Sequence, residues 1–338
     1  MQKWIRSFIT AATLGAAVMP AAYVAAAGST TVAGYSKHPE AQVFIQELAA
    51  QGFDRGELEA ALDQARKQES ILKAMSRPAE RRLTWGKYRK IFLGQKRIDQ
   101  GIEFWEKHRE TLERAEKTYG VPAEIIVAII GVETRYGRNM GSYRVLDALA
   151  TLGFDYPKRG KFFRGQLKEY LLMAREEGLT DLTQLKGSYA GAMGFGQFIP
   201  SSFRNFAVDF DNDGKRDIWT NRVDAIGSVA NYFNKHGWKT GEPVRASVSF
   251  SGPVKDEWVN QSLKPTRTLK DWNGLGVQSK TSLDASQVAT LVGLKTGDAT
   301  QYWFGLHNFY VITRYNHSRL YASAVYELSQ QIRNAVKK

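Results

Sequence analysis

One carboxylate, Glu133, follows an uncharged and almost wholly apolar stretch of the chain, a placement that suits a general acid. Residues 125–132 carry no charge, and a stretch that is apolar on every side predicts a buried helix. Pro122 suits the first position of this helix, and Glu124 lies in its first turn. At the C-terminal end of the helix, desolvation and the helix dipole both disfavour a negative charge on Glu133. Both effects raise its pKa, as proton donation near neutral pH requires.

Glu133 also has a purely structural interpretation. Arg135 and Arg138 follow it closely, and structural ion pairs perturb pKa values as active sites do. Taken alone, Glu133 fits such a pair better than a catalytic role. The choice between the two therefore depends on the rest of the chain.

A second group of carboxylates has the spacing of a cation-binding loop. Residues 209–217 carry carboxylates at positions 1, 3, 5 and 9 of an EF-hand-like loop, with glycine at position 6; this pattern supplies oxygen ligands and a tight turn. Position 12 is Thr220 instead of glutamate, and Asp224, at position 16, could supply the missing ligand from a longer loop. The pattern predicts a calcium site, with sodium or a solvated acidic turn as alternatives.

Two further segments combine groups that suit a sugar. Residues 187–198 mix glycines and aromatics with Gln197, whose amide could bond hydroxyls or acetamides. Residues 314–318 (RYNHS) precede the last predicted helix, and Tyr321 lies one turn into it. Aromatic rings there could stack on a sugar. Helix capping and core packing are the alternatives for each of these residues taken singly.

Several catalytic patterns are missing from the sequence. None of its five histidines forms a His-Glu-x-x-His zinc motif, no Gly-x-Ser-x-Gly elbow occurs, and there is no cysteine. These absences disfavour metalloprotease, serine hydrolase and thiol chemistry. Without cysteine the chain can form neither a disulfide nor an N-terminal lipid anchor on cysteine.

The N-terminal residues 1–27 read as a secretory signal peptide. Lys3 and Arg6 precede an apolar stretch, and three alanines at 25–27 offer a cleavage site before Gly28. An uncleaved membrane anchor is the alternative, because the low-charge stretch is long enough to span a bilayer. The formal charge is +13, or +11 without Lys3 and Arg6, and a basic surface favours polyanions. For an exported protein, a cell wall with carboxylated stem peptides is a more natural polyanion than nucleic acid.

The elements that must position these residues are mostly helices. With 338 residues, 43% of them hydrophobic, the chain can bury a full core. Helices are predicted over 103–119, 162–177, 223–236 and 318–334, a capping box at Asp54 and Glu57 starts another, and 245–250 alternates like a strand. We expect a loose lead-in at 28–37, a helical domain at 38–120, a core at 121–242, a small β-containing region at 243–310 and a returning C-terminal segment at 311–338.

Four separated motifs, in order, resemble those of the lytic murein transglycosylase B family. They are residues 132–137 (VETRYG), 191–202 (GAMGFGQFIPSS), the acidic loop 209–217 with 223–233 (VDAIGSVANYF), and 314–318 (RYNHS). The resemblance covers nearly all of the chain after the signal peptide. It implies an α+β, mainly α fold, with a lysozyme-like core, a helical domain and a small β-containing domain.

The resemblance also implies an activity and a location. The substrate would be the glycan strand of peptidoglycan, cut between N-acetylmuramic acid and N-acetylglucosamine to leave 1,6-anhydromuramic ends. The protein would be periplasmic, with neither a lipid anchor nor a nucleic-acid partner, and enzymes of cell-wall synthesis or hydrolysis are candidate protein partners. Calcium would be structural, and the chemistry would need no cofactor.

The family's functional positions fall on particular residues of this chain. Glu133 would be the catalytic acid and base. The saccharide contacts would be Tyr88, Arg159, Ser188, Gln197, Tyr232, Tyr315, Asn316 and Tyr321. The calcium ligands would be Asp209, Asp211, Asp213, Lys215 through its carbonyl, and Asp224, in a loop that is one residue longer than the usual pattern.

Two rival functions remain open at this stage. A lysozyme-like muramidase would need a second essential carboxylate, for which Asp147 and Asp155 are candidates. A non-catalytic, calcium-stabilised protein that binds the wall would need no catalytic group.

Overall fold

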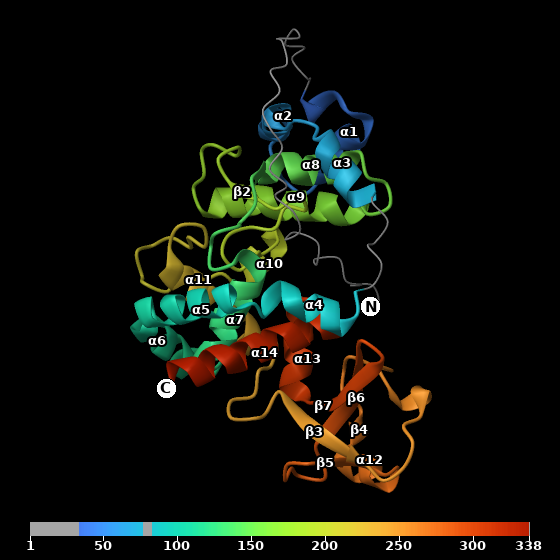
Figure 1. Cartoon of the computed structure of the whole chain (residues 1–338). Helices are drawn as coiled ribbons and strands as arrows, with labels where there is room; N and C mark the ends of the chain where they lie inside the picture. Colours follow the sequence, from blue (N-terminus) through green and yellow to red (C-terminus); the bar gives the residue numbers. More distant parts are fainter. Residues whose placement is uncertain (1–33, 77–82, 338) are drawn as a thin grey trace, which may run out of the picture.

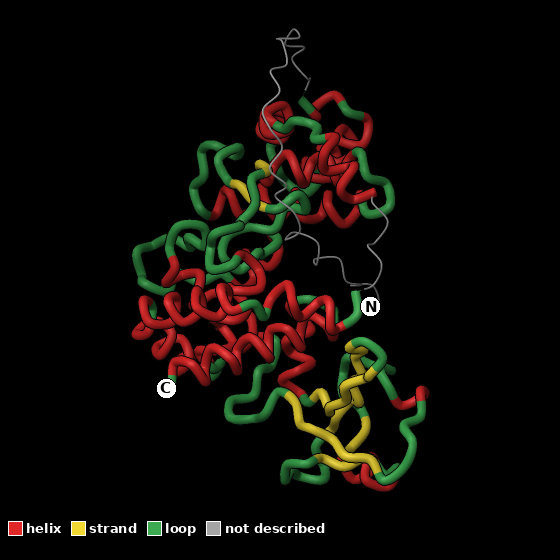
Figure 2. Tube along the Cα trace, viewed as in Figure 1, coloured by secondary structure: helices red, strands yellow, loops and turns green. Residues whose placement is uncertain are grey.

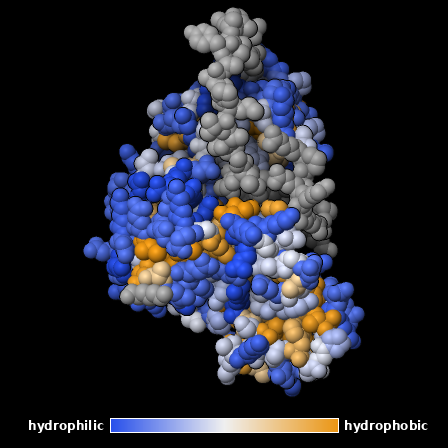
Figure 3. All heavy atoms as spheres, in the orientation of Figure 1, coloured by the Kyte–Doolittle hydropathy of each residue, from blue (hydrophilic) through white to orange (hydrophobic). Residues whose placement is uncertain are grey.

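The computed structural model describes residues 34–76 and 83–337, and within them it is a mainly helical protein with one small antiparallel sheet (Figures 1 and 2). The predicted signal peptide at 1–27 lies outside the described residues. None of the helices in the described part is long and apolar enough to cross a bilayer. Hydrophilic side chains cover most of the visible face of the helices (Figure 3).

One group of helices packs around an apolar core in the upper part of Figure 1. Within the group, α8 and α9 pack on each other. The group consists of η1 (Tyr35–Lys37), α1 (Pro39–Ala49), α2 (Arg55–Gln64), α3 (Glu69–Ser76), α8 (Val145–Phe154), α9 (Gly160–Glu176) and α10 (Pro200–Phe206). A short ladder of β1 (Tyr143–Arg144) with β2 (Lys186–Gly187) lies beside them.

A second group of helices surrounds α7 (Ala123–Thr134), in which eleven of twelve residues are buried. Helix α7 packs against α14, α5, α6 and α11. These helices cover its apolar side chains on every face, as a helix that is apolar all round requires. The surrounding helices are α4 (Trp85–Phe92), α5 (Gln95–Lys107), α6 (Arg109–Tyr119), α11 (Arg222–Lys235), α13 (His307–Tyr315) and α14 (Arg319–Val336).

The β domain contains a five-stranded antiparallel sheet in the order β4-β6-β7-β3-β5, with a core of its own. Its central hairpin pairs β6 with β7 from Thr290–Gly305 to Thr296–Ala299. The elements are β3 (Arg245–Phe250), η2 (Asp256–Trp258), β4 (Arg267–Thr268), α12 (Leu269–Gly274), β5 (Val277–Ser279), β6 (Val288–Thr296) and β7 (Ala299–Gly305). The following helices α13 and α14 return the chain to the helical part (Figure 1).

Helix boundaries agree with the local signals in most places. Asp54 caps α2 by accepting a hydrogen bond from the Glu57 amide at 2.8 Å, and Ser318 caps α14 by accepting one from the Tyr321 amide at 3.3 Å. The single helix predicted over 103–119 is wrong: the chain breaks at His108, which ends α5 and precedes α6. Charged residues on both sides of the break continue the helical period, so the sequence pattern does not reveal it.

Candidate active site

Helix α7 ends at the residue after Glu133, because Arg135 takes a left-handed conformation with a φ of 52°. The hydroxyl of Thr134 lies 3.0 Å from the carbonyl oxygen of Phe195 in the glycine-rich loop. The same hydroxyl accepts a hydrogen bond from the Gly137 amide. The end of α7 and the glycine-rich loop are therefore fixed against each other, with Glu133 beside their junction.

The carboxyl group of Glu133 is enclosed, although the residue keeps a partly exposed edge. Burial raises its pKa to about 7, opposed by a hydrogen bond from the Tyr321 hydroxyl to Oε1 at 2.5 Å. The alternative ion pair is not formed: Arg135 donates to Gln100, and Arg138 pairs with Glu103. Glu133 thus has the environment of a proton donor that works near neutral pH.

Four predicted saccharide-binding tyrosines surround Glu133, and we call Tyr88, Tyr232, Tyr315 and Tyr321 the tyrosine cluster. Burial and the charge of Glu133 raise the pKa of all four hydroxyls. The rings of Tyr232 and Tyr315 lie 4.6 Å apart, centre to centre. The cluster therefore brings together residues from α4, α11, α13 and α14.

The hydroxyls of the tyrosine cluster differ in their partners. Tyr232 donates to the carbonyl of Arg314 at 2.7 Å, and Tyr315 donates to the carbonyl of Gly196 at 2.5 Å. The hydroxyl of Tyr88 is buried and has no hydrogen-bond partner within residues 34–76 and 83–337. Tyr88 is thus the member of the cluster whose polar group is left for a ligand.

Of the other predicted saccharide contacts, Gln197 and Ser188 stabilise the glycine-rich loop itself. Gln197 adopts a φ of 52°, and its Nε2 donates to the carbonyls of Met140 and Gly194. The Ser188 hydroxyl accepts from the amide of Ala192 at 3.1 Å. Both residues are buried, so their first role in this structure is to shape the loop.

Asn316 and Arg159 occupy different surroundings. Asn316 is buried at the C-cap of α13, next to the tyrosine cluster in sequence, and its carbonyl accepts from the Ser318 amide at 2.7 Å. Arg159 precedes α9, and its guanidinium stacks on the rings of Phe162 and Phe163. Arg159 takes no part in the hydrogen bonds described around Glu133.

The two candidates for a second catalytic carboxylate are held in structural contacts. Asp147, 2% exposed, accepts from the Arg66 amide at 2.9 Å and pairs with Arg144 at 3.0 Å. Asp155 accepts a hydrogen bond from Tyr35 and lies 3.5 Å from the ammonium of Lys67. Both carboxylates connect the N-terminal helices to α8, and neither is bonded to the tyrosine cluster.

The acidic loop gathers the carboxylates of Asp209, Asp211 and Asp213, with one oxygen of each within 4.8 Å of the others. Gly214 makes the turn with a φ of 89°. Like charges at this separation repel each other, and hard oxygen donors around one point suit a hard cation. The donor set and the turn therefore fit the predicted calcium ion.

Asp224 is placed differently from the three clustered aspartates. It is fully buried, and its two oxygens accept from the amides of Phe210 at 2.7 Å and Asp217 at 2.8 Å. Burial raises its pKa. The Lys215 amide donates to Asp213 at 2.9 Å. Asp224 thus fastens both ends of the loop to α11.

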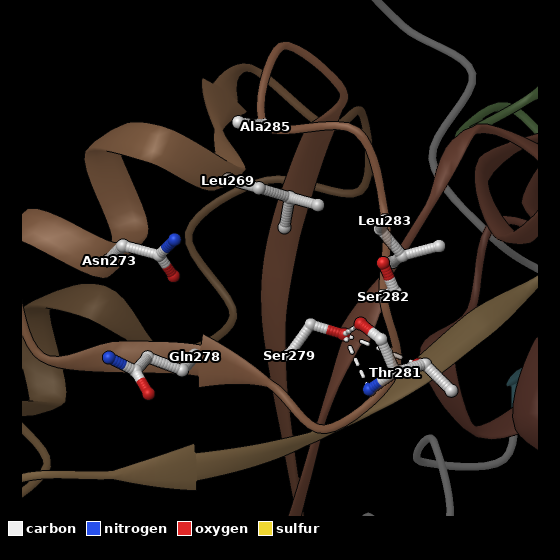
Figure 4. Close-up of a pocket in the computed structure, with 8 residues that line it drawn as sticks. All are labelled: Leu269, Asn273, Gln278, Ser279, Thr281, Ser282, Leu283 and Ala285. Atoms are coloured by element: carbon white, nitrogen blue, oxygen red, sulfur yellow. Dashed lines mark hydrogen bonds between the residues drawn. The ribbon is translucent and has the colours of Figure 1, made fainter.

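A pocket of about 330 Å³ lies in the β domain, between α12, β5 and the loop after β5 (Figure 4). Its polar lining comes from Asn273, Gln278, Ser279, Thr281 and Ser282, with Leu269 on one wall. None of its lining residues is a predicted site residue.

Two residues have contacts at the site that the sequence did not indicate. Tyr321, a predicted saccharide contact, also donates a hydrogen bond from its hydroxyl to Glu133. Thr134 was not singled out, although it joins α7 to the glycine-rich loop. Its position next to Glu133 was the one available signal.

Comparison with known proteins places this geometry in a family. Residues 36–330 match the family described as the Transglycosylase SLT domain. The chain is 44% identical over 308 residues to the membrane-bound lytic murein transglycosylase B of Escherichia coli, covering 88% of this chain and 84% of that protein.

Solved structures agree with this result. The catenated lytic transglycosylase SltB1 from Pseudomonas aeruginosa has 50% identity and a TM-score of 0.86, covering 89% of this chain and 99% of that one. Escherichia coli Slt35 in complex with calcium has 44% identity and a TM-score of 0.81, covering 90% and 96%. SltB3 from Pseudomonas aeruginosa, in complex with NAG-anhNAM-pentapeptide, has 32% identity and a TM-score of 0.76, covering 87% and 78%.

The chain belongs to the Transglycosylase SLT domain family. This result confirms the predicted family, the predicted class of enzyme, a lytic murein transglycosylase, and the mainly α fold class with its lysozyme-like core.

Proposed function

We propose that the protein cleaves the β-1,4 bond between N-acetylmuramic acid and N-acetylglucosamine of peptidoglycan, with Glu133 as acid and then base. The observation that carries this proposal is the enclosed carboxyl group of Glu133, whose pKa burial raises to about 7 and which is bonded to Tyr321. An ordinary glycosidase uses two carboxylates, and here Asp147 and Asp155 are engaged elsewhere.

The reaction proceeds in two proton transfers. Glu133, protonated at first, donates its proton to the glycosidic oxygen as the bond from that oxygen to C1 breaks. The acetamide oxygen of the muramic residue stabilises the charge that develops at C1. The Glu133 carboxylate then takes the proton of the 6-hydroxyl, whose oxygen bonds to C1 and closes the 1,6-anhydro ring. Glu133 ends protonated, and water is not consumed.

Tyr321 serves both states of Glu133 in this scheme. Its hydroxyl donates to the carboxylate, and a hydrogen bond to the charged form lowers the pKa that burial raises. The group is therefore poised near neutrality, where it can give a proton and take one back. Tyr321 therefore positions Glu133, in addition to its proposed contact with the saccharide.

The other members of the tyrosine cluster are proposed to contact the saccharide near Glu133. Tyr88 offers a buried hydroxyl without a protein partner in the described residues, and the rings of Tyr232 and Tyr315 are apolar surfaces of the kind on which sugars stack. We keep Gln197, Ser188, Asn316 and Arg159 as proposed contacts with longer stretches of glycan. The complex of SltB3 with NAG-anhNAM-pentapeptide supports a peptidoglycan fragment as the ligand.

Mass spectrometry of digested sacculi tests this function. Soluble fragments with anhydromuramic ends support the proposal, whereas reducing ends indicate a muramidase. Binding to sacculi without release of fragments indicates a wall-binding protein. Digestion in ¹⁸O-water sharpens the result, because hydrolysis introduces the label at C1 and ring closure by the 6-hydroxyl does not.

We also propose that calcium occupies the acidic loop as a structural ion, held by Asp209, Asp211 and Asp213, the Lys215 carbonyl and Asp224. The clustering of three carboxylates supports it, and so does the calcium complex of Slt35. The ion would offset the repulsion among these carboxylates and would fix the loop that leads into α11.

The proposed location is the periplasm, after export by the signal peptide at 1–27. The positive start, the apolar stretch and the alanine cleavage site support it. Mass analysis of the protein from fractionated cells should give a chain that begins at Gly28 in the periplasmic extract; a chain that begins at Met1 in the membrane fraction would indicate a retained anchor.

A further inference from the structure

Helix α4 carries Tyr88 on one edge and contacts the β domain on another. Tyr88 packs against Phe92 one turn later, with ring centres 5.2 Å apart, and its buried hydroxyl lies within the electrostatic reach of Glu133. The placement of this hydroxyl therefore depends on how α4 is held. The helix has only eight residues, so most of its stability must come from tertiary contacts.

The β6–β7 hairpin supplies contacts to the first turn of α4. The indole of Trp85, fully buried, donates to Oε1 of Gln301 at 3.2 Å. The turn of the hairpin packs on Gly86, where an added Cβ would lie 3.2 Å from Cγ2 of Thr296. A hydrogen bond and a close backbone approach thus fix α4 against the sheet.

A half-buried carboxylate joins α4 and the sheet to α14. Glu327 of α14 pairs with Arg89 of α4 at 3.0 Å and with Arg245 of β3 at 3.3 Å. The guanidinium of Arg245 lies between the rings of Trp303 and Tyr326, 4.8 and 4.7 Å from their centres. The sheet, α4 and α14 are therefore joined at several points on the side of α4 that faces the sheet, and Tyr88 lies on a neighbouring edge.

We propose that Gln301 is a positioning residue for the reaction: through Trp85, the β domain holds α4 so that the Tyr88 hydroxyl faces the substrate beside Glu133. This inference rests on the proposed function and adds to it a role for the β domain. Gln301 touches no reacting group, and it acts only through the orientation of α4.

Kinetics of two Gln301 variants test the positioning. Gln301→Leu keeps the size of the side chain but removes the acceptor, and it should lower kcat about tenfold with little change in KM, because a small misplacement of a contact group slows the chemical step. Gln301→Glu keeps an acceptor oxygen and should restore kcat to within about threefold of wild type. Gln278→Leu, at an exposed position of β5 in the same domain, is the matched control and should leave kcat unchanged.

A double-mutant cycle with Tyr88→Phe decides whether Gln301 acts through Tyr88. If it does, Gln301→Leu should cost less than about twofold in the Tyr88→Phe background, because the hydroxyl that it positions is already gone. Effects that multiply, or a Gln301→Leu variant with wild-type kcat, would overturn the inference.

Gly86→Ala gives an independent route if Gln301→Leu fails to fold. The added methyl meets Thr296 and shifts α4 while the Trp85 hydrogen-bond partner remains, so the same cycle with Tyr88→Phe applies. Multiplying effects in that cycle would likewise overturn the inference.

Glu133→Gln separates the two proposals: an active Glu133→Gln variant removes the proposed function, whereas an inactive one beside an unaffected Gln301→Leu removes only the role of Gln301.

Discussion

Glu133 and the aspartates of the acidic loop carry the same functional group in opposite surroundings. Glu133 is enclosed at the end of an apolar helix, and burial raises its pKa to about 7. Asp211 is exposed, and its pKa is lowered, first by the hydrogen bond from Asn221. The first site favours a carboxyl group that holds its proton, and the second favours carboxylates that stay charged side by side.

The difference shows that the function of a carboxylate depends on which protein groups replace its hydrating water in the folded state. Around Glu133 the replacement is apolar side chains and one donor, Tyr321. In the acidic loop it is a set of backbone amides, such as that of Gly214 on Asp209 at 2.8 Å. A proton suits the first site and a hard cation suits the second.

Glu133→Gln should show the largest effect. The amide cannot donate or accept the required proton, so release of anhydro fragments from sacculi should fall by at least about 10³-fold. Circular dichroism should show a normally folded protein. Robust release of fragments by this variant would remove Glu133 from the chemistry.

The same variant also tests the environment of Glu133 through stability. Because the pKa of Glu133 is raised in the folded state, wild type loses stability as pH rises from the unfolded pKa of about 4.3 through the folded pKa of about 7. Glu133→Gln should escape this loss and be more stable than wild type by about 1–3 kcal/mol at pH 8. Equal pH dependence of urea unfolding in both proteins would contradict the buried-acid environment.

Tyr321→Phe should have the next largest effect. Loss of the hydrogen bond to Glu133 leaves burial unopposed, so the pKa of Glu133 rises further and the alkaline limb of the kcat/KM profile moves to higher pH. The base form becomes harder to reach, and kcat should fall about tenfold. Tyr310→Phe in α13, whose hydroxyl has no role in the site, is the control. An unshifted pH profile would mean that Tyr321 does not control Glu133.

Calcium should stabilise the second site without entering the chemistry. At about a hundredfold excess over Kd, binding stabilises a protein by about 2.7 kcal/mol, which corresponds to roughly 5 °C in Tm for a chain of this size. Asp209→Ala should abolish the calcium-dependent rise in Tm, and Asp256→Ala, an exposed aspartate of the β domain, should keep it. A rise in Tm that survives Asp209→Ala would place the ion elsewhere.

Asp155→Asn should have the smallest effect on the reaction. Its partners are Tyr35, His38 and Lys67, so the change should leave the anhydro products and should alter kcat by less than about twofold. A loss of activity as large as that of Glu133→Gln, or a switch to reducing ends, would favour the muramidase.

Local patterns in the sequence predicted both the buried helix that carries Glu133 and the acidic loop. The apolar stretch before Glu133 predicts burial and a raised pKa without any tertiary information, and the spacing of the acidic loop predicts the cluster of Asp209, Asp211 and Asp213. Both features arise from residues close together in the chain.

Contacts between distant residues could not be read in the same way. Tyr321 is separated from Glu133 by 188 positions, and Gln301 from Trp85 by 216. Nothing in the residue types says which of many tyrosines reaches a carboxyl group, because that depends on how α14 crosses α7. The resemblance to a family identified Tyr321 as a site residue but did not indicate its hydrogen bond to Glu133.

The most direct test of the central claim is a titration of Glu133 itself. Carbon-13 NMR of protein labelled at the glutamate side-chain carboxyl carbon, with Glu133→Gln to assign the resonance, would follow one carboxyl group as pH changes. A midpoint near pH 7 is the expected result. A midpoint near that of a free glutamate, about 4.3, would contradict the assignment of Glu133 as the proton donor.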